Sequence, residues 1–270
     1  MESDVASFLY GFGYVLLALG AGLLVDASRQ AVYSSVVRDL LPAGFPLPSF
    51  KKLASFGWAV NLCGLGVLLI HQAKVSGTRL TIGALCCFSS AALLLAYQAY
   101  TAGFDTALGM GLLAQAVPLA PLACVLLIAY VAGMGSRPRA AYRPTSLVAV
   151  LHAALLFAAG AYTLFGPKGA AKAQLHTLLS AEGLESSLFL ASTLAFASIS
   201  LHTGMNDSKA AASQLCACAT MAAAYGALAL TKPKASASLW PLVAGYGLLA
   251  ALGMLENLTK KGGKGKVKTS

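Results

Sequence analysis

The chain contains a series of apolar runs whose lengths match the thickness of a lipid bilayer. The clearest pair comprises residues 55–70 and 80–100, which are separated by a short polar link. At about 1.5 Å per residue, an α-helix of about 20 residues crosses the ~30 Å hydrocarbon layer. Inside that layer a helix satisfies its own backbone hydrogen bonds, which an open strand cannot do. These runs therefore predict membrane-spanning helices.

The runs continue over the whole chain, so the prediction extends to the fold class. Of the 270 residues 58% are hydrophobic and 10% are charged, whereas soluble domains carry roughly 25% charged residues. The runs are residues 7–25, 55–70, 80–100, 107–134, 145–165, 186–201, 210–230 and 239–255. We expect an all-α polytopic membrane protein of about eight transmembrane helices. Pro118 and Pro121 predict a kink in the fourth helix.

The second half of the chain resembles the first in element order and in some residues. At an offset of 131, identical residues pair Ser55, His71, Cys87, Ala91, Ala92 and Ala96 with Ser186, His202, Cys218, Ala222, Ala223 and Ala227. The first and fifth runs align at an offset of 140, and the fourth and eighth at 120. This internal repeat predicts two tandem four-helix bundles. They would occupy residues 1–135 and 145–258, with a basic proline-containing linker at 136–144 and a basic tail at 259–270.

Small residues on two of the runs favour close helix packing, because they let two backbones approach each other. On the first run they are Gly11, Gly13, Gly20 and Gly22. On the seventh run they are Ala219, Ala223 and Ala227, spaced by about one helical turn. The alanines predict tight packing inside the protein or against another subunit.

The net charge of +10 comes from lysines and arginines in the links and the tail. They are not interleaved with aromatic residues, so we expect no nucleic-acid partner. Lipid phosphates and neighbouring membrane subunits are the expected partners. The candidate residues for these contacts are Lys51, Lys52, Arg137, Arg139, Arg143, Lys260, Lys261 and Lys264.

No acidic or basic residue falls near the middle of a run. Ion-coupled carriers usually need such a group, so ion-driven transport is disfavoured. The mild polar residues within the runs include Asn61, Gln98, Gln115 and His152, which form interhelical hydrogen bonds or line a solute- or cofactor-binding pocket. The cysteines lack metal- or redox-site spacing, and no nucleophilic triad is evident. We therefore expect no metal, no resident cofactor and no enzymatic activity.

Histidines leave one alternative to this expectation. His71 and His202 end equivalent runs, and His152 lies deep within the fifth run. Imidazole is a common axial ligand of haem. The alternative is a membrane oxidoreductase component that binds haem or quinone through one of these histidines.

A few residues of the first half resemble the DoxX-like four-helix membrane family. They are Gly20, Phe45-Pro46, Gly57, Gly64 and Thr78-Arg79. In these proteins one span is followed by an interfacial helix, a proline-containing approach and three further spans. Family members commonly carry an acidic residue in the second span, where this chain has Asn61 and, in its second half, Ser192. The resemblance implies a supporting role beside membrane oxidoreductases or in membrane assembly.

These observations lead to one main functional hypothesis. We expect a non-catalytic accessory or scaffold subunit of a larger membrane complex, such as a respiratory or other energy-converting complex. The mitochondrial inner membrane is the favoured location for such a subunit. A facilitator of a neutral or apolar small solute is the alternative, with Asn61, Gln98, Gln115 and His152 along its path.

Overall fold

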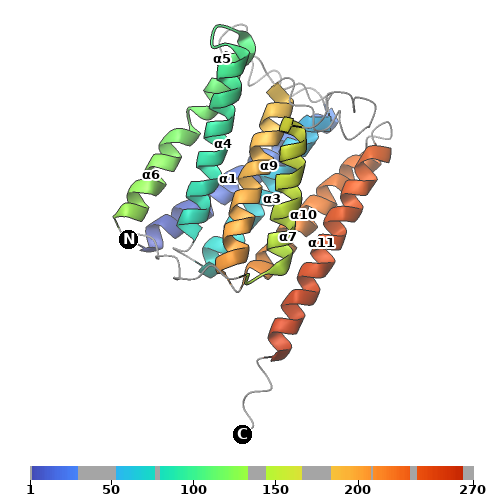
Figure 1. Ribbon diagram of the computed structural model, residues 1–270. Coiled ribbons are helices and arrows are strands. Elements are labelled where there is room, and N and C mark those ends of the chain that lie inside the picture. The colour runs from blue at the N-terminus through green and yellow to red at the C-terminus, as the bar shows by residue number, and fades with distance from the viewer. Residues whose placement is uncertain are drawn as a thin grey trace.

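The computed structural model describes residues 2–29, 53–76, 80–132, 144–165, 184–207, 209–231 and 236–263. These residues form an all-helical bundle without a strand among them (Figure 1). The helices are α1 (Glu2–Arg29), α3 (Leu53–Ser76), α4 (Leu80–Ala102), α5 (Ala107–Ala116), α6 (Leu119–Val131), α7 (Leu147–Phe165), α9 (Leu184–Asn206), α10 (Ala210–Thr231) and α11 (Ser236–Gly263). The predicted fold class is confirmed.

Within the described residues, seven helical segments are long and apolar enough to cross a membrane, with mean hydropathies from 1.3 to 2.2. One of them is α5 and α6 taken together, and α7 supplies a shorter apolar stretch, Leu147–Ala161. The chain is therefore an integral, multi-pass membrane protein. The kink predicted in the fourth run is confirmed as a break at Val117 and Pro118. Pro121 falls in the first turn of α6. Amide groups in the first turn of a helix have no acceptor within that helix, so a proline there costs no helical hydrogen bond.

Two helices, α3 and α9, form the centre of the bundle. Their membrane segments are 83% and 78% buried, whereas the corresponding fraction is 39% or less in the other candidate spans. In Figure 1 they lie between α4 on one side and α10 with α11 on the other. Asn61 of α3 donates hydrogen bonds to the hydroxyls of Ser192 and Thr193 of α9, each at 3.0 Å. Asn61 and Ser192 are themselves related by the offset of 131.

Helices from the two predicted units interdigitate around this centre. α4 packs mainly against α9 and has few contacts with α3, while α10 packs against α11 and α3 and has few contacts with α9. α1 packs on α3, α7 packs on α9, and α11 packs on α10. The described helices of the two predicted units, 1–135 and 145–258, thus share one bundle. The predicted linker lies outside the described residues except for Pro144.

The pairs α1–α3 and α7–α9 approach each other at corresponding glycines. A Cβ atom on Gly20 would lie 2.7 Å from the Ala59 carbonyl oxygen and from the Cys63 sulfur. A Cβ atom on Gly160 would lie 2.7 Å from a methyl carbon of Leu194. Gly20 and Gly160 differ by 140 in number, and Cys63 and Leu194 differ by 131. The two contacts therefore obey the offsets found in the sequence.

For α4 and α10 the structural register differs from the sequence offset. Their burial follows the same order over residues 83–100 and 213–230 at an offset of 130 rather than 131, except at the pairs 86/216 and 89/219. One residue corresponds to about 100° of helical rotation. The predicted pairing of Cys87 with Cys218 is thus displaced by one position, and Phe88 is the residue of α4 that corresponds to Cys218.

Candidate functional site

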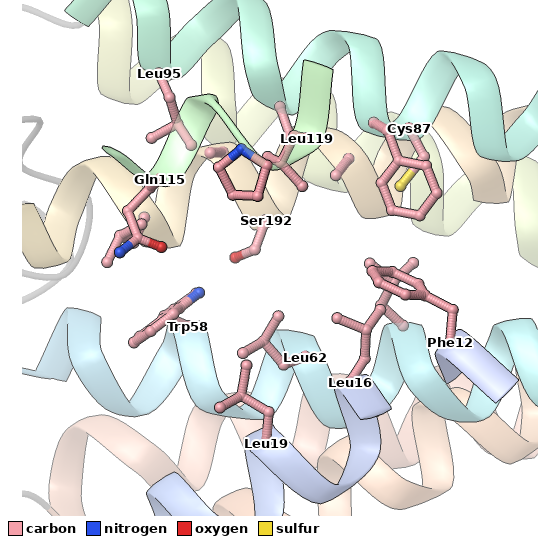
Figure 2. Close-up of a pocket in the computed structure, with 17 residues that line it drawn as sticks. Phe12, Leu16, Leu19, Trp58, Leu62, Cys87, Leu95, Gln115, Leu119 and Ser192 are labelled. Atoms are coloured by element: carbon pink, nitrogen blue, oxygen red, sulfur yellow. The ribbon is translucent and has the colours of Figure 1, made fainter. Parts of the chain in front are cut away.

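An apolar cavity of about 170 Å³ lies between α1, α3, α4, α9 and the α5–α6 segment (Figure 2). Aliphatic and aromatic side chains form most of its wall. The lining residues are Phe12, Leu16, Leu19, Trp58, Leu62, Leu65, Cys87, Phe88, Ala91, Leu95, Gln115, Pro118, Leu119, Leu188, Ala191, Ser192 and Ala195. An engineered cavity of roughly 150 Å³ binds benzene in another protein. The space here therefore suits a single ring or a short branched hydrocarbon.

The cavity has an apolar end and a polar end. Phe12 and Phe88 meet edge to face at the apolar end, with ring centroids 5.1 Å apart. In Figure 2 the Trp58 indole nitrogen, the Gln115 amide and the Ser192 hydroxyl face the opposite end. Indole donates a hydrogen bond, and the amide and hydroxyl both donate and accept. The cavity thus combines a hydrocarbon wall with a small polar corner, as small-molecule sites usually do.

The cavity opens on the outer surface of the bundle. Leu19 of α1 and Pro118, at the start of α6, both line it and are both exposed. Of the described helices, α1 and α6 have few or no contacts with each other. An outward-facing surface of the spans is in contact with lipid in a membrane. The described residues therefore leave the cavity open toward this surface.

The helix break in the fourth run positions the polar corner. Gln115 lies in the last turn of α5, immediately before Val117 and Pro118 interrupt the helix. Thr106 begins α5, where its hydroxyl accepts a hydrogen bond from the Gly109 amide at 3.0 Å. The start and the end of α5 are therefore both determined locally. The Gln115 side chain forms part of the cavity wall, on the same side of it as Trp58 and Leu95.

The four predicted pocket residues are not gathered in one site. Gln115 lines the cavity, whereas Asn61 is 1% exposed and bonds to α9 beside it. Gln98 is buried on α4, and its side-chain oxygen has no hydrogen-bond partner among the described residues. His152 lies among other residues of α7, α10 and α11. The cavity wall also includes Trp58, which the polarity pattern of the sequence did not single out.

His152 belongs to a buried polar cluster in the second half of the chain. Its Nδ1 atom contacts the Gln214 amide nitrogen and lies 3.8 Å from the Cys218 sulfur. The Phe196 and Tyr246 rings pack edge-on against the imidazole, with centroids 5.1 and 5.6 Å away. A haem bound to His152 would require these rings to move. This surrounding does not fit a macrocycle.

The other histidines have different partners. His71 Nδ1 and the Ser213 hydroxyl are 2.8 Å apart, joining α3 to α10. His202 lies against Gly83 of α4, where an added Cβ would come within 2.9 Å of the imidazole. Within the described residues, no group of three or more His, Cys, Asp or Glu side chains is arranged to hold a metal ion.

At two positions the second half carries tyrosines where the corresponding residues of the first half are leucines. At offsets of 140, 130 and 120, Phe12, Leu95 and Leu126 correspond to His152, Tyr225 and Tyr246. Tyr225 and Tyr246 stack with ring centroids 5.7 Å apart, and Tyr246 also packs on His152. These rings add volume relative to the two leucines. Of these three positions of the first half, Phe12 and Leu95 line the cavity and Leu126 does not.

The predicted lipid- or partner-contacting cations fall largely outside the described residues. This applies to Lys51, Lys52, Arg137, Arg139, Arg143 and Lys264, and the structure does not describe the side chain of Lys261. Lys260 is described, and its ammonium lies 2.5 Å from Glu256 and also contacts the Thr145 carbonyl. The second Glu256 oxygen accepts from the Val148 amide at 3.0 Å. This junction attaches the end of α11 to the start of α7.

No family model, curated protein or solved structure matches this chain. The resemblance to the DoxX-like family stays a prediction. The cavity and its polar corner are therefore interpreted from their own geometry.

Proposed function

We propose that this protein is a non-catalytic membrane protein that binds a small neutral or apolar molecule inside its bundle. It would act as a facilitator of that molecule or as the binding component of a larger assembly. The observation that supports this proposal is the cavity, with hydrocarbon walls and a mouth at Leu19 and Pro118. A molecule dissolved in the bilayer reaches this space without crossing water, and burial in it requires no charge to be desolvated.

The two tryptophans of the chain allow a direct binding test. Trp58 lines the cavity, whereas Trp240 of α11 is 48% exposed on the outside of the bundle. In the variant Trp240→Phe, reconstituted in lipid nanodiscs, the fluorescence reports on the cavity alone. Bromocyclohexane, a neutral quencher of about the right size, should quench Trp58 with a saturable dependence on its concentration. In Trp58→Phe the lipid-facing Trp240 should show only the linear quenching that partition into lipid produces.

Two alanine substitutions complete the test. Ala195 lines the cavity and is 3% exposed, so Ala195→Phe should fill the cavity and abolish the saturable quenching. Ala223→Phe adds the same ring on the outer surface of α10 and should leave binding unchanged. Linear quenching in Trp240→Phe, or saturable quenching that survives Ala195→Phe, would show that the cavity is not a binding site.

A second candidate function is the accessory subunit of a membrane complex, including the organellar location expected for it. The observation that favours this candidate concerns the alanine stripe of α10. Ala219, Ala223 and Ala227 are all exposed on the outside of the bundle, so they do not serve packing within the described part of the chain. Small residues spaced by one turn let a helix of another subunit approach closely.

Native electrophoresis of mildly solubilised membranes, followed by mass spectrometry, tests this second candidate. The wild-type chain should migrate within a larger complex, and Ala223→Phe should release it. Leu93→Phe is the control, because Leu93 of α4 is 72% exposed and already bulky. Migration of the wild-type chain near its own mass of 27.5 kDa, allowing for detergent, would contradict the subunit hypothesis.

A further inference from the structure

The polar corner of the cavity has unused hydrogen-bonding capacity. Ser192 donates to the Phe189 carbonyl at 2.8 Å and accepts from Asn61 at 3.0 Å, so one lone pair of its oxygen remains. Among the described residues, the structure gives no hydrogen bond to the Trp58 indole or to the Gln115 amide. Trp58 is 9% exposed and Ser192 is 8% exposed. A donor and an amide therefore face the cavity without a hydrogen-bond partner from the described residues.

The charges around the cavity limit the molecules that it accepts. Among the residues that the structure describes, no aspartate, glutamate, lysine, arginine or histidine lines the cavity. An ion buried there would lose its hydration and gain no partner, which is strongly unfavourable. A molecule with a single uncharged oxygen, in contrast, would regain hydrogen bonds at the corner. Trp58 donates only, so this oxygen must be an acceptor, as in a carbonyl or a hydroxyl group.

The length of the cavity gives the orientation of such a molecule. On α4, Phe88 lies beside Phe12 at the apolar end, and Leu95 lies at the polar end. Their separation of seven positions corresponds to about 10 Å along the helix. A ring-sized hydrocarbon body therefore extends from the corner toward Phe12 and Phe88. A longer tail would leave through the mouth at Leu19 and Pro118 into lipid.

From this arrangement we infer that the cavity selects an uncharged amphipathic molecule with one carbonyl or hydroxyl oxygen. The oxygen lies at the corner formed by Trp58, Gln115 and Ser192, and the hydrocarbon body lies against the two phenylalanines. This inference rests on the proposed binding function and adds the chemical class and the orientation of the ligand. A hydrocarbon chain of a membrane lipid would fill the same walls but would leave the corner unsatisfied.

The test compares two probes that differ at one group. Cyclohexyl methyl ketone and ethylcyclohexane have the same carbon skeleton, and only the ketone carries an oxygen. Each probe is used to displace bromocyclohexane from Trp240→Phe protein in nanodiscs, with concentrations corrected for partition into lipid. A net hydrogen bond worth about 1 kcal/mol makes the ketone about fivefold more effective than the hydrocarbon. Bonding of the ketone to the indole N–H should also shift the Trp58 emission to longer wavelength.

Variants at the corner assign the preference to its residues. Gln115→Leu should reduce the ketone preference toward unity while the hydrocarbon still binds, and Ser192→Ala provides a second variant with a smaller change. Gln98→Leu removes a buried amide that does not line the cavity, so it should keep the full preference. Thermal melting of each variant confirms that it is folded before its binding is compared.

The outcomes separate this inference from the function on which it rests. The polar corner would be refuted if both probes displaced bromocyclohexane equally. It would also be refuted if Gln115→Leu and Ser192→Ala both left the preference for the ketone intact. In either case the cavity would remain an apolar binding site. If bromocyclohexane shows no saturable quenching at all, the proposed function itself fails, and the inference fails with it.

Discussion

The contact between α1 and α3 gives a prediction that depends on a few tenths of an ångström. At Gly20 an added Cβ would lie 2.7 Å from the Ala59 carbonyl oxygen and 2.9 Å from the Cys63 amide nitrogen. Both are backbone atoms, so a rotamer change cannot relieve the overlap. An ordinary contact begins near 3.4 Å. Gly20→Ala therefore requires α1 to move away from α3 by about 0.7 Å.

That displacement has an estimable effect on stability. Overpacking a close contact typically costs about 1–3 kcal/mol, and a gap of 0.5–1 Å forfeits roughly a quarter to a half of the dispersion energy of each affected contact. Alanine also favours a helix by up to about 1 kcal/mol relative to glycine. We therefore expect Gly20→Ala to lower the free energy of unfolding by about 1–2 kcal/mol.

Gly22 provides a matched control on the same helix. A Cβ atom there would meet nothing within 4 Å, so Gly22→Ala gains the helix preference without an overlap. Unfolding of both variants is followed in detergent by thermal melting and by titration with a denaturing detergent. Gly20→Ala should melt below the wild type, and Gly22→Ala at or above it. Equal behaviour of the two variants would refute the close packing of α1 on α3.

Two further predictions concern polar contacts between helices. Glu256→Ala should lower the free energy of unfolding by about 1–3 kcal/mol, because it leaves the Val148 amide at the start of α7 without its charged acceptor. Lys260→Ala should lower it by less than about 1 kcal/mol, because the Lys260 side chain is 36% exposed. The prediction fails if Lys260→Ala lowers the melting temperature more than Glu256→Ala does. Asn61→Leu should cost only about 1 kcal/mol, since interhelical hydrogen bonds in membranes average roughly 0.6 kcal/mol each and both partner hydroxyls keep their bonds to the Phe189 carbonyl. Quenching of Trp58 by bromocyclohexane should persist in Asn61→Leu, and its loss would assign Asn61 to the binding site.

The arrangement of the central helices bears on how this protein folds. α4 packs on α9, and α10 packs on α3, so each half completes its packing only with helices of the other half. The contacts of Gly20 with α3 and of Gly160 with α9 follow the same pair of offsets, which supports the interpretation of the chain as a repeat. A fragment that ends near residue 135 would lack α9, so the face of α4 that packs against α9 would be uncovered. The two halves are therefore expected to depend on each other for stability.

The candidate site was only partly predictable from the sequence. Gln115 stands out because it is a polar residue three positions before a proline inside an apolar run. Trp58 and Ser192 give no such signal, since a tryptophan and a serine are common in transmembrane helices. Their approach to Gln115 depends on how α3, α5 and α9 pack together. That packing joins residues that lie 57 to 134 positions apart in the chain, which no local pattern specifies.

The sequence by itself determined that this chain is an all-helical, multi-pass membrane protein. The reason is local, because an apolar run in lipid must satisfy its own backbone hydrogen bonds and its length sets whether it crosses. The tertiary structure alone decided which face of each helix meets a neighbour. Gly13 and Gly20 pack against α3. A Cβ atom added to Gly11 or Gly22 of the same helix would have no described atom within 4 Å. Lipid tails are as apolar as leucine, so hydrophobicity does not distinguish an inner from an outer face, and shape complementarity between distant helices makes that choice.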